Sequence, residues 1–391
     1  MPIVLTRATK QAARYTPLGG SEHCSACRFY MPQGTCGRII GPVSPEGWCK
    51  YYSREAVQRS NPGYAGFGGQ PPGLTADLNF MLTPGTLPPG VVFTRASTAT
   101  YFDVTGAIQT ASTNTPRWTY DPVTHASRGL LMETSRTNLL LNSATLGTQS
   151  VAVTAQAYML SFYGTGTITL TGTSTAGPLV GTGAFPQRVA LTFTPTAGTL
   201  TCTVTGSVLN AQLEAGSFAS SWISTTGAAA TRAADVCSLT DAVLLGGTTD
   251  RTLAVNAYAA NVTPAGVAAY WACVDDASNN NVHNLISPGN STNLHAQITV
   301  GAVSKVNGGD TTGGTRPGLF KAALANGAIW NGAVNGVLMA GAGGASQQHG
   351  PLTTLHCGCN QLNAGQCDGA IQRVRYWPRG LSQAELLQVT T

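Results

Sequence analysis

The chain has 391 residues, only 9% of them charged, and a formal net charge of +5. This length exceeds the roughly 250 to 300 residues at which a single hydrophobic core stops growing, so we expect several domains. The positive excess lies wholly within residues 1–60, and the rest of the chain is balanced. A basic excess confined to one short cysteine-rich segment argues against nucleic acid as a partner.

The first thirty residues contain no uninterrupted apolar run of the signal-peptide kind, and nowhere do 18 apolar residues follow one another. We therefore expect synthesis in a cytoplasm without a signal peptide, and no membrane partner. In such a reducing compartment, ten cysteines indicate metal ligands or free thiols rather than disulfides.

The N-terminal region concentrates its cysteines within residues 24–49, at Cys24, Cys27, Cys36 and Cys49. A C-x2-C pair lets two thiolates reach one metal from a single turn, and the other two cysteines would close the site from separate loops. Zinc sites more often take their second half from another close pair, whereas a larger iron–sulfur cluster accepts ligands spread in this way.

Aromatic residues surround these cysteines at Phe29, Tyr30, Trp48 and Tyr51. An apolar shell of this kind limits water access and tunes the potential of a cluster. CxxCRFY, then a lone cysteine, then EGWC followed by KYY resembles the high-potential iron–sulfur proteins. The resemblance implies a [4Fe-4S] cluster on the four cysteines, with zinc, disulfides or free thiols as alternatives. Residues 1–60 are too few to fold by burial alone, so the metal would serve as the core of an anchor domain.

Residues 61–75, NPGYAGFGGQPPGLT, indicate a Gly/Pro linker. After it come short runs rich in Val, Thr, Tyr, Phe and Leu, separated by Gly, Pro, Asn and Asp. The Thr-x-Thr alternation of residues 165–173 and 199–205 predicts strands with one buried and one hydroxyl face. The clearest helix is LSQAELLQV, where Ser382 and Glu385 match a capping box. The fold class expected is therefore mainly β, with one or two antiparallel β-sandwich (jelly-roll) domains after the iron–sulfur domain.

Four segments carry a second resemblance: FTRASTATYFD, NTPRWTYDP, RGLLMETSRTNLL, and NAQLEAGSFASSWISTTGAAATRAADV. They resemble a module of tailed-phage structural proteins described as head spike, tail fibre or carbohydrate-binding-like. The module spans residues 76–236, and residues 145–209 look like a shortened jelly roll. Residues 237–391 resemble a laminin-G or concanavalin-like sandwich, with NGVL at 335–338 as an inner hairpin and GAIQRVRYWPRGLSQAELLQV as the closing strand and helix.

Candidate catalytic residues are few. Glycoside cleavage needs two carboxylates about 5 to 10 Å apart, but Asp275 and Asp276 are adjacent and would face opposite sides of a strand. Charged residues beside a core run are usually paired, so Glu133, Arg136 and Glu214 are interpreted as structural brackets. No nucleophile elbow, P-loop or HExxH motif occurs. We predict no enzymatic activity and name no catalytic residue.

The remaining cysteines and tryptophans have a structural interpretation beside a functional one. His356, Cys357, Cys359 and Cys367 could form a second metal site, but buried cysteine is often only a small hydrophobe, as we also expect for Cys202, Cys237 and Cys273. Tryptophans could stack on sugars or fill a sandwich core, and those weighed are Trp118, Trp222, Trp271 and Trp330. No glycan-binding residue is assigned from the sequence.

These observations favour a bacteriophage virion structural protein, a tail fibre or head spike. The expected partners are other virion proteins of the portal, connector, tail or capsid, further copies of the chain in a homotrimer, and a host cell-surface glycan. The alternatives are an iron–sulfur electron-transfer protein, suggested by the cysteines alone, and a capsule depolymerase.

Overall fold

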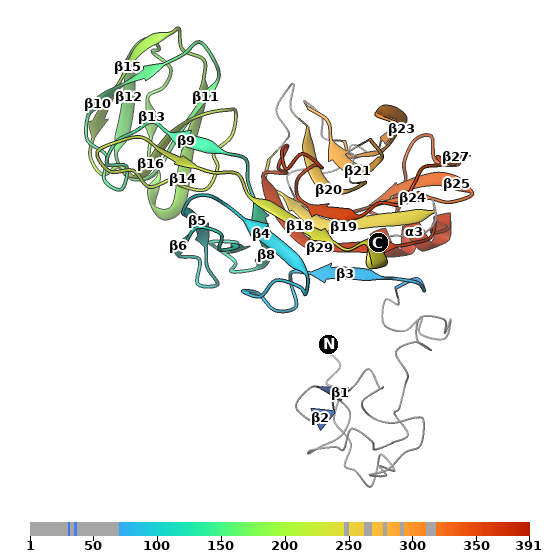
Figure 1. The fold of residues 1–391 in the computed structure, drawn as a ribbon. Helices are drawn as coiled ribbons and strands as arrows, with labels where there is room; N and C mark the ends of the chain where they lie inside the picture. The colour runs from blue at the N-terminus through green and yellow to red at the C-terminus, as the bar shows by residue number, and fades with distance from the viewer. Residues whose placement is uncertain are drawn as a thin grey trace. The chain divides into compact units, whose positions relative to one another are not determined.

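The computed structural model describes residues 70–245, 250–261, 268–276, 280–289, 293–309 and 318–391, and the backbone of residues 30–31 and 35–36. The chain divides into two compact units, Met1–Leu74 and Thr75–Thr391. In the first, β1 (Tyr30–Met31) pairs antiparallel with β2 (Thr35–Cys36). The second is mainly β with antiparallel sheets (Figure 1), which confirms the sandwich expectation at this coarser level. No helix within the described residues is long and apolar enough to cross a membrane.

Two large sheets form one sandwich. The seven-stranded sheet has the order β23 (Val303–Gly309), β22 (His295–Val300), β21 (Val282–Ser287), β20 (Ala269–Asp275), β28 (Thr354–Cys357), β18 (Val236–Thr240) and β4 (Val91–Thr94). The nine-stranded sheet has the order β26 (Val337–Leu338), β25 (Ile329–Val334), β24 (Gly318–Asn326), β19 (Arg251–Ala259), β29 (Gly369–Trp377), β8 (Ser127–Met132) and β7 (Trp118–Tyr120), with β27 (Gly344–Ala345) on β25 and β3 (Ala76–Asn79) on β29.

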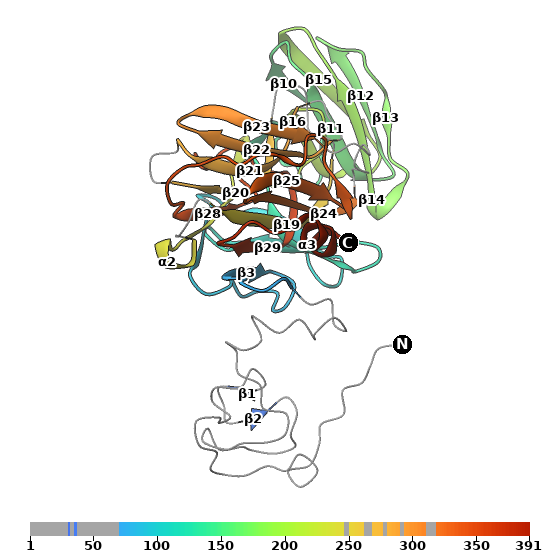
Figure 2. The ribbon, with the colours of Figure 1, turned by 90° about the vertical axis from the view of Figure 1, so that its right-hand side faces the viewer.

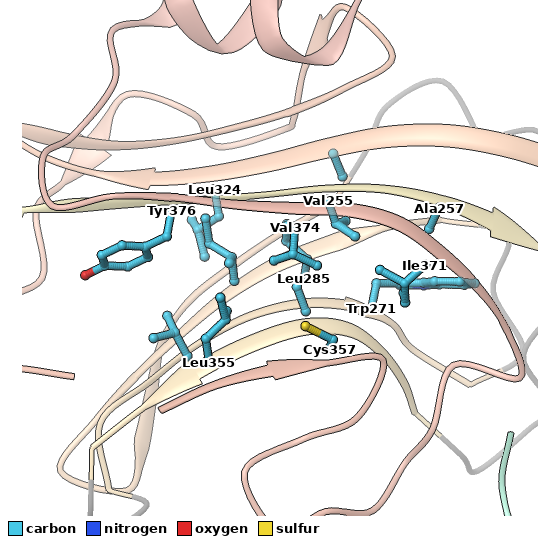
Figure 3. Packing of buried hydrophobic residues seen from close by; sticks show 14 of the residues in the cluster. Val255, Ala257, Trp271, Leu285, Leu324, Leu355, Cys357, Ile371, Val374 and Tyr376 are labelled. Carbon is cyan, nitrogen blue, oxygen red and sulfur yellow. The ribbon is translucent and has the colours of Figure 1, made fainter. Parts of the chain in front are cut away.

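The core of this large sandwich lies between its two sheets. Val255 and Val374 come from the nine-stranded sheet and meet Leu285 and Leu355 from the seven-stranded one (Figure 3), and all four are completely buried. Burying a side chain of this size stabilises the fold by about 1.5 to 3 kcal/mol. Trp271 belongs to the same core, its ring centroid 4.8 Å from that of Phe320 in an edge-on arrangement.

A smaller sandwich has its own core. Its sheets are β10 (Gln149–Val153), β15 (Gly198–Thr205), β12 (Thr167–Gly172) and β13 (Leu179–Val180), and β14 (Gly183–Phe193), β11 (Tyr158–Gly164) and β16 (Leu209–Ala215). The threonine alternation is as predicted, because Ile168 and Leu170 of β12 are buried while Thr169 and Thr171 are exposed. The segment that resembles a shortened jelly roll thus closes into a two-sheet sandwich.

Four short strands and two short helices complete the described residues. The strands are β5 (Ala99–Phe102) with β6 (Ile108–Ala111), and β9 (Arg136–Asn138) with β17 (Ala230–Arg232). The helices are α2 (Ala242–Leu245) and α3 (Gln383–Thr390), and α3 lies against β24 and β25 (Figure 2). The Ser382–Glu385 capping box at the start of α3 is present as predicted.

The strand pairing crosses the boundary predicted between residues 236 and 237. β3 and β8 pair with β29, and β4 pairs with β18, so strands before residue 133 complete the sheets of the C-terminal sandwich. At Gly129 in β8, φ is +108° and a Cβ would stand 2.4 Å from the carbonyl oxygen of Ile371. The predicted boundary follows the extent of the sequence resemblance, whereas the observed sheets follow backbone hydrogen bonding between distant segments.

Candidate functional site

The four segments that resemble phage structural proteins contribute one buried ionic cluster, made of Arg95, Arg117, Glu133, Arg232 and Asp235. Arg117 lies at its centre, with Nη1 2.7 Å from Glu133 Oε2 and Nη2 2.5 Å from Asp235 Oδ2. Arg95 Nη1 lies 3.1 Å from Asp235 Oδ1, and Arg232 Nη1 lies 3.3 Å from Glu133 Oε2. Each residue stands at or beside the end of a strand, so the cluster joins strand ends that are far apart in sequence.

The residues of the ionic cluster stabilise the charged forms of one another. Burial alone would lower the pKa of Arg117, but Asp235 and Glu133 raise it above its ordinary value. Burial alone would raise the pKa of Glu133, but Arg232 and Arg117 lower it to about 2. The side chain of Ser221 donates to Glu133 Oε2 at 2.6 Å and its backbone N–H donates to Oε1 at 2.7 Å. With its pKa lowered to about 2, Glu133 has no proton to exchange at neutral pH.

The three residues interpreted as brackets are indeed partnered. Glu133 lies in the ionic cluster, and Glu214 is completely buried and accepts hydrogen bonds from Ser220 and Gln212. Arg136 donates to the carbonyl oxygen of Ala215, and its guanidinium carbon lies 4.8 Å from the centroid of the Phe218 ring. These contacts fix loops between strands.

A pocket lies beside the ionic cluster and encloses about 160 Å³. We call it the aromatic pocket. Its aromatic lining residues are Tyr101, Phe102, Tyr163, Phe218, Trp222 and Tyr258, and its charged ones are Arg128, Glu133, Arg188 and Asp368. The strands that supply them are β5, β11 and β14 of the small sandwich, and β8 and β19 of the large one. Glu133, Phe218, Trp222 and Asp368 lie in loops, so tertiary packing alone assembles the lining.

The aromatic rings continue to the surface through Phe185, which is 39% exposed. Its ring centroid lies 5.9 Å from that of Phe102 and 5.4 Å from that of Tyr163. Both distances fall within the range of favourable aromatic pairs. The Arg128 guanidinium lies 4.3 Å above the Tyr258 ring. One side of the pocket is thus a wall of packed rings.

Asp368 is a buried carboxylic acid in the lining of the pocket, and its pKa is shifted. Burial raises its pKa to about 6, against hydrogen bonding from the backbone N–H of Thr134 and attraction to Arg136. The Thr134 N–H and hydroxyl donate to Asp368 Oδ1 at 2.8 and 3.0 Å. Its φ of +46° is a left-handed conformation that Asp and Asn tolerate better than other residues.

Three of the four tryptophans weighed are core residues. Trp118, Trp271 and Trp330 are 5%, 1% and 7% exposed, while Trp222 is partly buried and lines the aromatic pocket. The sequence had no means of separating Trp222 from the others, because all four lie in similar strand-like contexts. It also gave no signal for Arg188, Tyr258 or Asp368.

The cysteines after residue 200 are buried free thiols, as interpreted from the sequence: Cys202, Cys237, Cys273, Cys357, Cys359 and Cys367. Burial raises the pKa of Cys202 to about 11 and that of Cys359 to about 12. His356 Nε2 lies 3.1 Å from Asp275 Oδ1, so this histidine contacts a carboxylate. Among the described residues no group of three or more His, Cys, Asp or Glu could hold a metal ion.

The predicted cluster ligands Cys24, Cys27 and Cys49, and the side chain of Cys36, lie outside the described residues, as do the shell residues Phe29, Trp48 and Tyr51. The backbone of β1 and β2 places Cys36 opposite Tyr30, three positions after Cys27 in the sequence. The side chain of Tyr30, the remaining predicted shell residue, also lies outside the described residues.

No protein-family model and no curated protein matches the chain. Among solved structures, the CBM40 module of the Ruminococcus gnavus IT-sialidase is 16% identical, with a TM-score of 0.30 over 36% of this chain and 83% of that one. The leech intramolecular trans-sialidase is 17% identical (TM-score 0.29) over 37% of this chain and 23% of its own. A SAP-like pentraxin from Limulus polyphemus is 10% identical (TM-score 0.28) over 66% and 82%.

At these scores the likenesses define neither a family nor a ligand for this chain. The class that the observed strands define is a mainly β protein built of antiparallel sandwiches.

Proposed function

We propose that this chain is a structural protein of a bacteriophage virion, a tail fibre or head spike, that assembles as a homotrimer, has no enzymatic activity and meets a host cell-surface glycan through its sandwiches. One observation carries the proposal: the segments that resemble phage structural proteins supply every member of the ionic cluster. The five charged residues of the cluster pair with one another and so join strand ends, which supports a structural role for these segments. Charged residues that pair in this way are typical of a structural protein.

The direct test is the composition of the particle. Virions purified by density gradient and analysed by mass spectrometry should contain the chain in stoichiometric amount, and its absence would overturn the proposal. Sedimentation equilibrium of the purified chain should give three times the protomer mass of 40.2 kDa. Incubation with host capsular polysaccharide should release no reducing ends, whereas cleavage would favour the depolymerase alternative.

The N-terminal part of the proposal is a [4Fe-4S] cluster on Cys24, Cys27, Cys36 and Cys49, with zinc as the alternative metal and binding to other virion proteins as the role. When bound, the metal would supply the core that so short a segment lacks. The visible absorption spectrum of freshly purified protein, with iron, sulfide and zinc assayed together, separates the two metals. Cys36→Ser should abolish incorporation into virions. A variant that assembles normally but loses a reversible one-electron couple would favour electron transfer.

A further inference from the structure

The size of the aromatic pocket limits what it can hold. A cavity of about 150 Å³ accommodates one benzene ring, and pockets for drug-sized ligands run from about 300 to 1,000 Å³. At about 160 Å³, the aromatic pocket takes a single six-membered ring. Its walls combine flat aromatic faces with Thr100, Ser220 and charged groups. That mixture matches a sugar ring, which presents C–H groups on its faces and hydroxyls on its rim.

The charge of Arg188 is not balanced by a carboxylate. Arg128, the other basic residue of the lining, has Nη2 2.5 Å from Asp121 Oδ2, whereas Arg188 forms no ion pair within the described residues. Its Nη1 donates to the Ser220 carbonyl at 2.6 Å and its Nη2 to the Ser161 hydroxyl at 2.8 Å. Tyr163, which also lines the pocket, forms a side-chain hydrogen bond with Arg188 as well. A guanidinium has five N–H donors, so at least one terminal N–H remains, and the buried Nε has no partner.

The groups around Arg188 leave a positive balance. Glu133 is neutralised inside the ionic cluster, where three arginines face two carboxylates. Asp368 is the remaining acid of the lining and carries at most one negative charge. An anion entering the pocket therefore meets the Arg188 guanidinium, whose positive charge no carboxylate balances and which binds a carboxylate more strongly than a neutral hydroxyl.

We propose that the aromatic pocket binds a hexuronic acid residue at the end of a glycan, with the sugar ring against the aromatic wall and its carboxylate on Arg188. The proposal rests on the glycan contact in the proposed function and gives it a place and a chemical class. Acidic polysaccharides with such residues would then be the surface that the protein meets.

The test compares matched sugars on the full chain. Methyl glycosides of glucuronic and galacturonic acid, titrated calorimetrically and followed by saturation-transfer NMR, should include at least one that binds tenfold or more tightly than the glucose or galactose counterpart. In Arg188→Gln, the affinity for that uronide should fall to the affinity for its neutral counterpart. In Arg188→Lys, the affinity should lie between these two values, because an ammonium supplies the charge without the planar guanidinium. Arg373→Gln, at the exposed pair with Asp77, should change nothing.

A second variant, on the aromatic wall, tests the proposal independently in case the Arg188 variants do not fold. Phe102→Ser, in the β5–β6 hairpin, should lower the affinity for the uronide and for the neutral sugar by the same factor, because it removes an aromatic ring and leaves the charge of Arg188 in place. Equal affinity for acidic and neutral sugars, no binding of either, or an unchanged preference in Arg188→Gln would overturn the proposal. If the chain is present in virions but binds no uronide, the pocket assignment fails and the virion role stands. If the chain binds uronides but is absent from virions, the virion role fails and the pocket assignment stands.

Discussion

Arg117 donates to two carboxylates at once, and both it and these partners are buried. Removing a charged group from water costs several kcal/mol, which close pairing offsets only when every member is present. The ionic cluster is therefore a set in which each residue depends on the others. A surface pair such as Arg373–Asp77, with side chains 25% and 36% exposed, lacks this dependence because water screens it.

Replacing Glu133 by Gln should destabilise the protein by about 3 to 5 kcal/mol, because three buried arginines would share a single carboxylate. The measurement is the free energy of unfolding from urea titration of the wild type and the variant. Asp77→Asn is the matched control and should cost less than about 1 kcal/mol. Equal effects of the two substitutions would contradict the role assigned to the ionic cluster.

Asp368 should make stability depend on pH. Because its folded-state pKa, about 6, lies above the ordinary value of 3.8, the folded protein keeps a proton that the unfolded chain releases. The stabilisation is fully present below about pH 4 and is lost as the pH rises through 6. Asp368→Asn keeps an oxygen that can accept from Thr134, and Asn tolerates the left-handed backbone. The unfolding free energy of this variant should therefore change less between pH 4 and 7 than that of the wild type. Parallel profiles for the two proteins would contradict this.

At the scale of elements, α3 and the β25–β26 hairpin follow local rules. Asn335 and Gly336, both at positive φ, form the two-residue turn between Val334 and Val337. In α3, the Ser382 hydroxyl accepts from the Glu385 N–H, and the Glu385 carboxylate accepts from the Ser382 N–H. The nearest few residues decide both features, so they are visible in the sequence.

Ser382→Ala should destabilise the protein by about 1 kcal/mol, the usual cost of losing a helix N-cap. The readout is the midpoint of thermal unfolding together with hydrogen exchange of the first turn of α3. Ser382→Asp, which restores a capping oxygen, should recover most of the loss. If the Asp variant is no more stable than the Ala variant, the cap contributes little here.

At the scale of the whole molecule, the large sandwich is completed by strands from both ends of Thr75–Thr391. Its nine-stranded sheet includes β3, β7 and β8, and its seven-stranded sheet ends in β4. All four strands precede residue 133, and the small sandwich lies between them and the remaining strands in the chain.

A chain of residues 75–391 should therefore fold by itself, whereas residues 237–391 should not, because the second piece leaves the core face beneath four strands uncovered. Circular dichroism and urea titration of both pieces provide the measurement. The longer piece should show a cooperative transition and the shorter one aggregation or a broad, non-cooperative change. A cooperative transition in residues 237–391 would show that the boundary predicted after residue 236 is also a folding boundary.

The part of the fold predicted from sequence is the part set by local pattern. Ile168 and Leu170 alternate with threonines and form a strand, and the Ser382–Glu385 spacing begins a helix. The interpretation of Glu133 as a bracket followed from its position beside a core run. Its ionic partners could not be predicted, since Arg232 lies about a hundred positions later in the chain and no local rule joins the two residues.

Local pattern in the sequence predicted a mainly β, antiparallel protein and the helix that begins after Ser382. It favoured buried thiols for the later cysteines, and the laminin-G-like resemblance implied the hairpin at residues 335–338. These properties depend on periods of two residues, turn chemistry and capping, which act over a few positions. Tertiary packing alone places β3, β4, β7 and β8 in the large sandwich, brings five charges into one cluster, and puts Arg188 and Trp222 in the lining of one pocket. Those depend on hydrogen bonding and burial between segments far apart in the chain, which no short stretch of residues encodes.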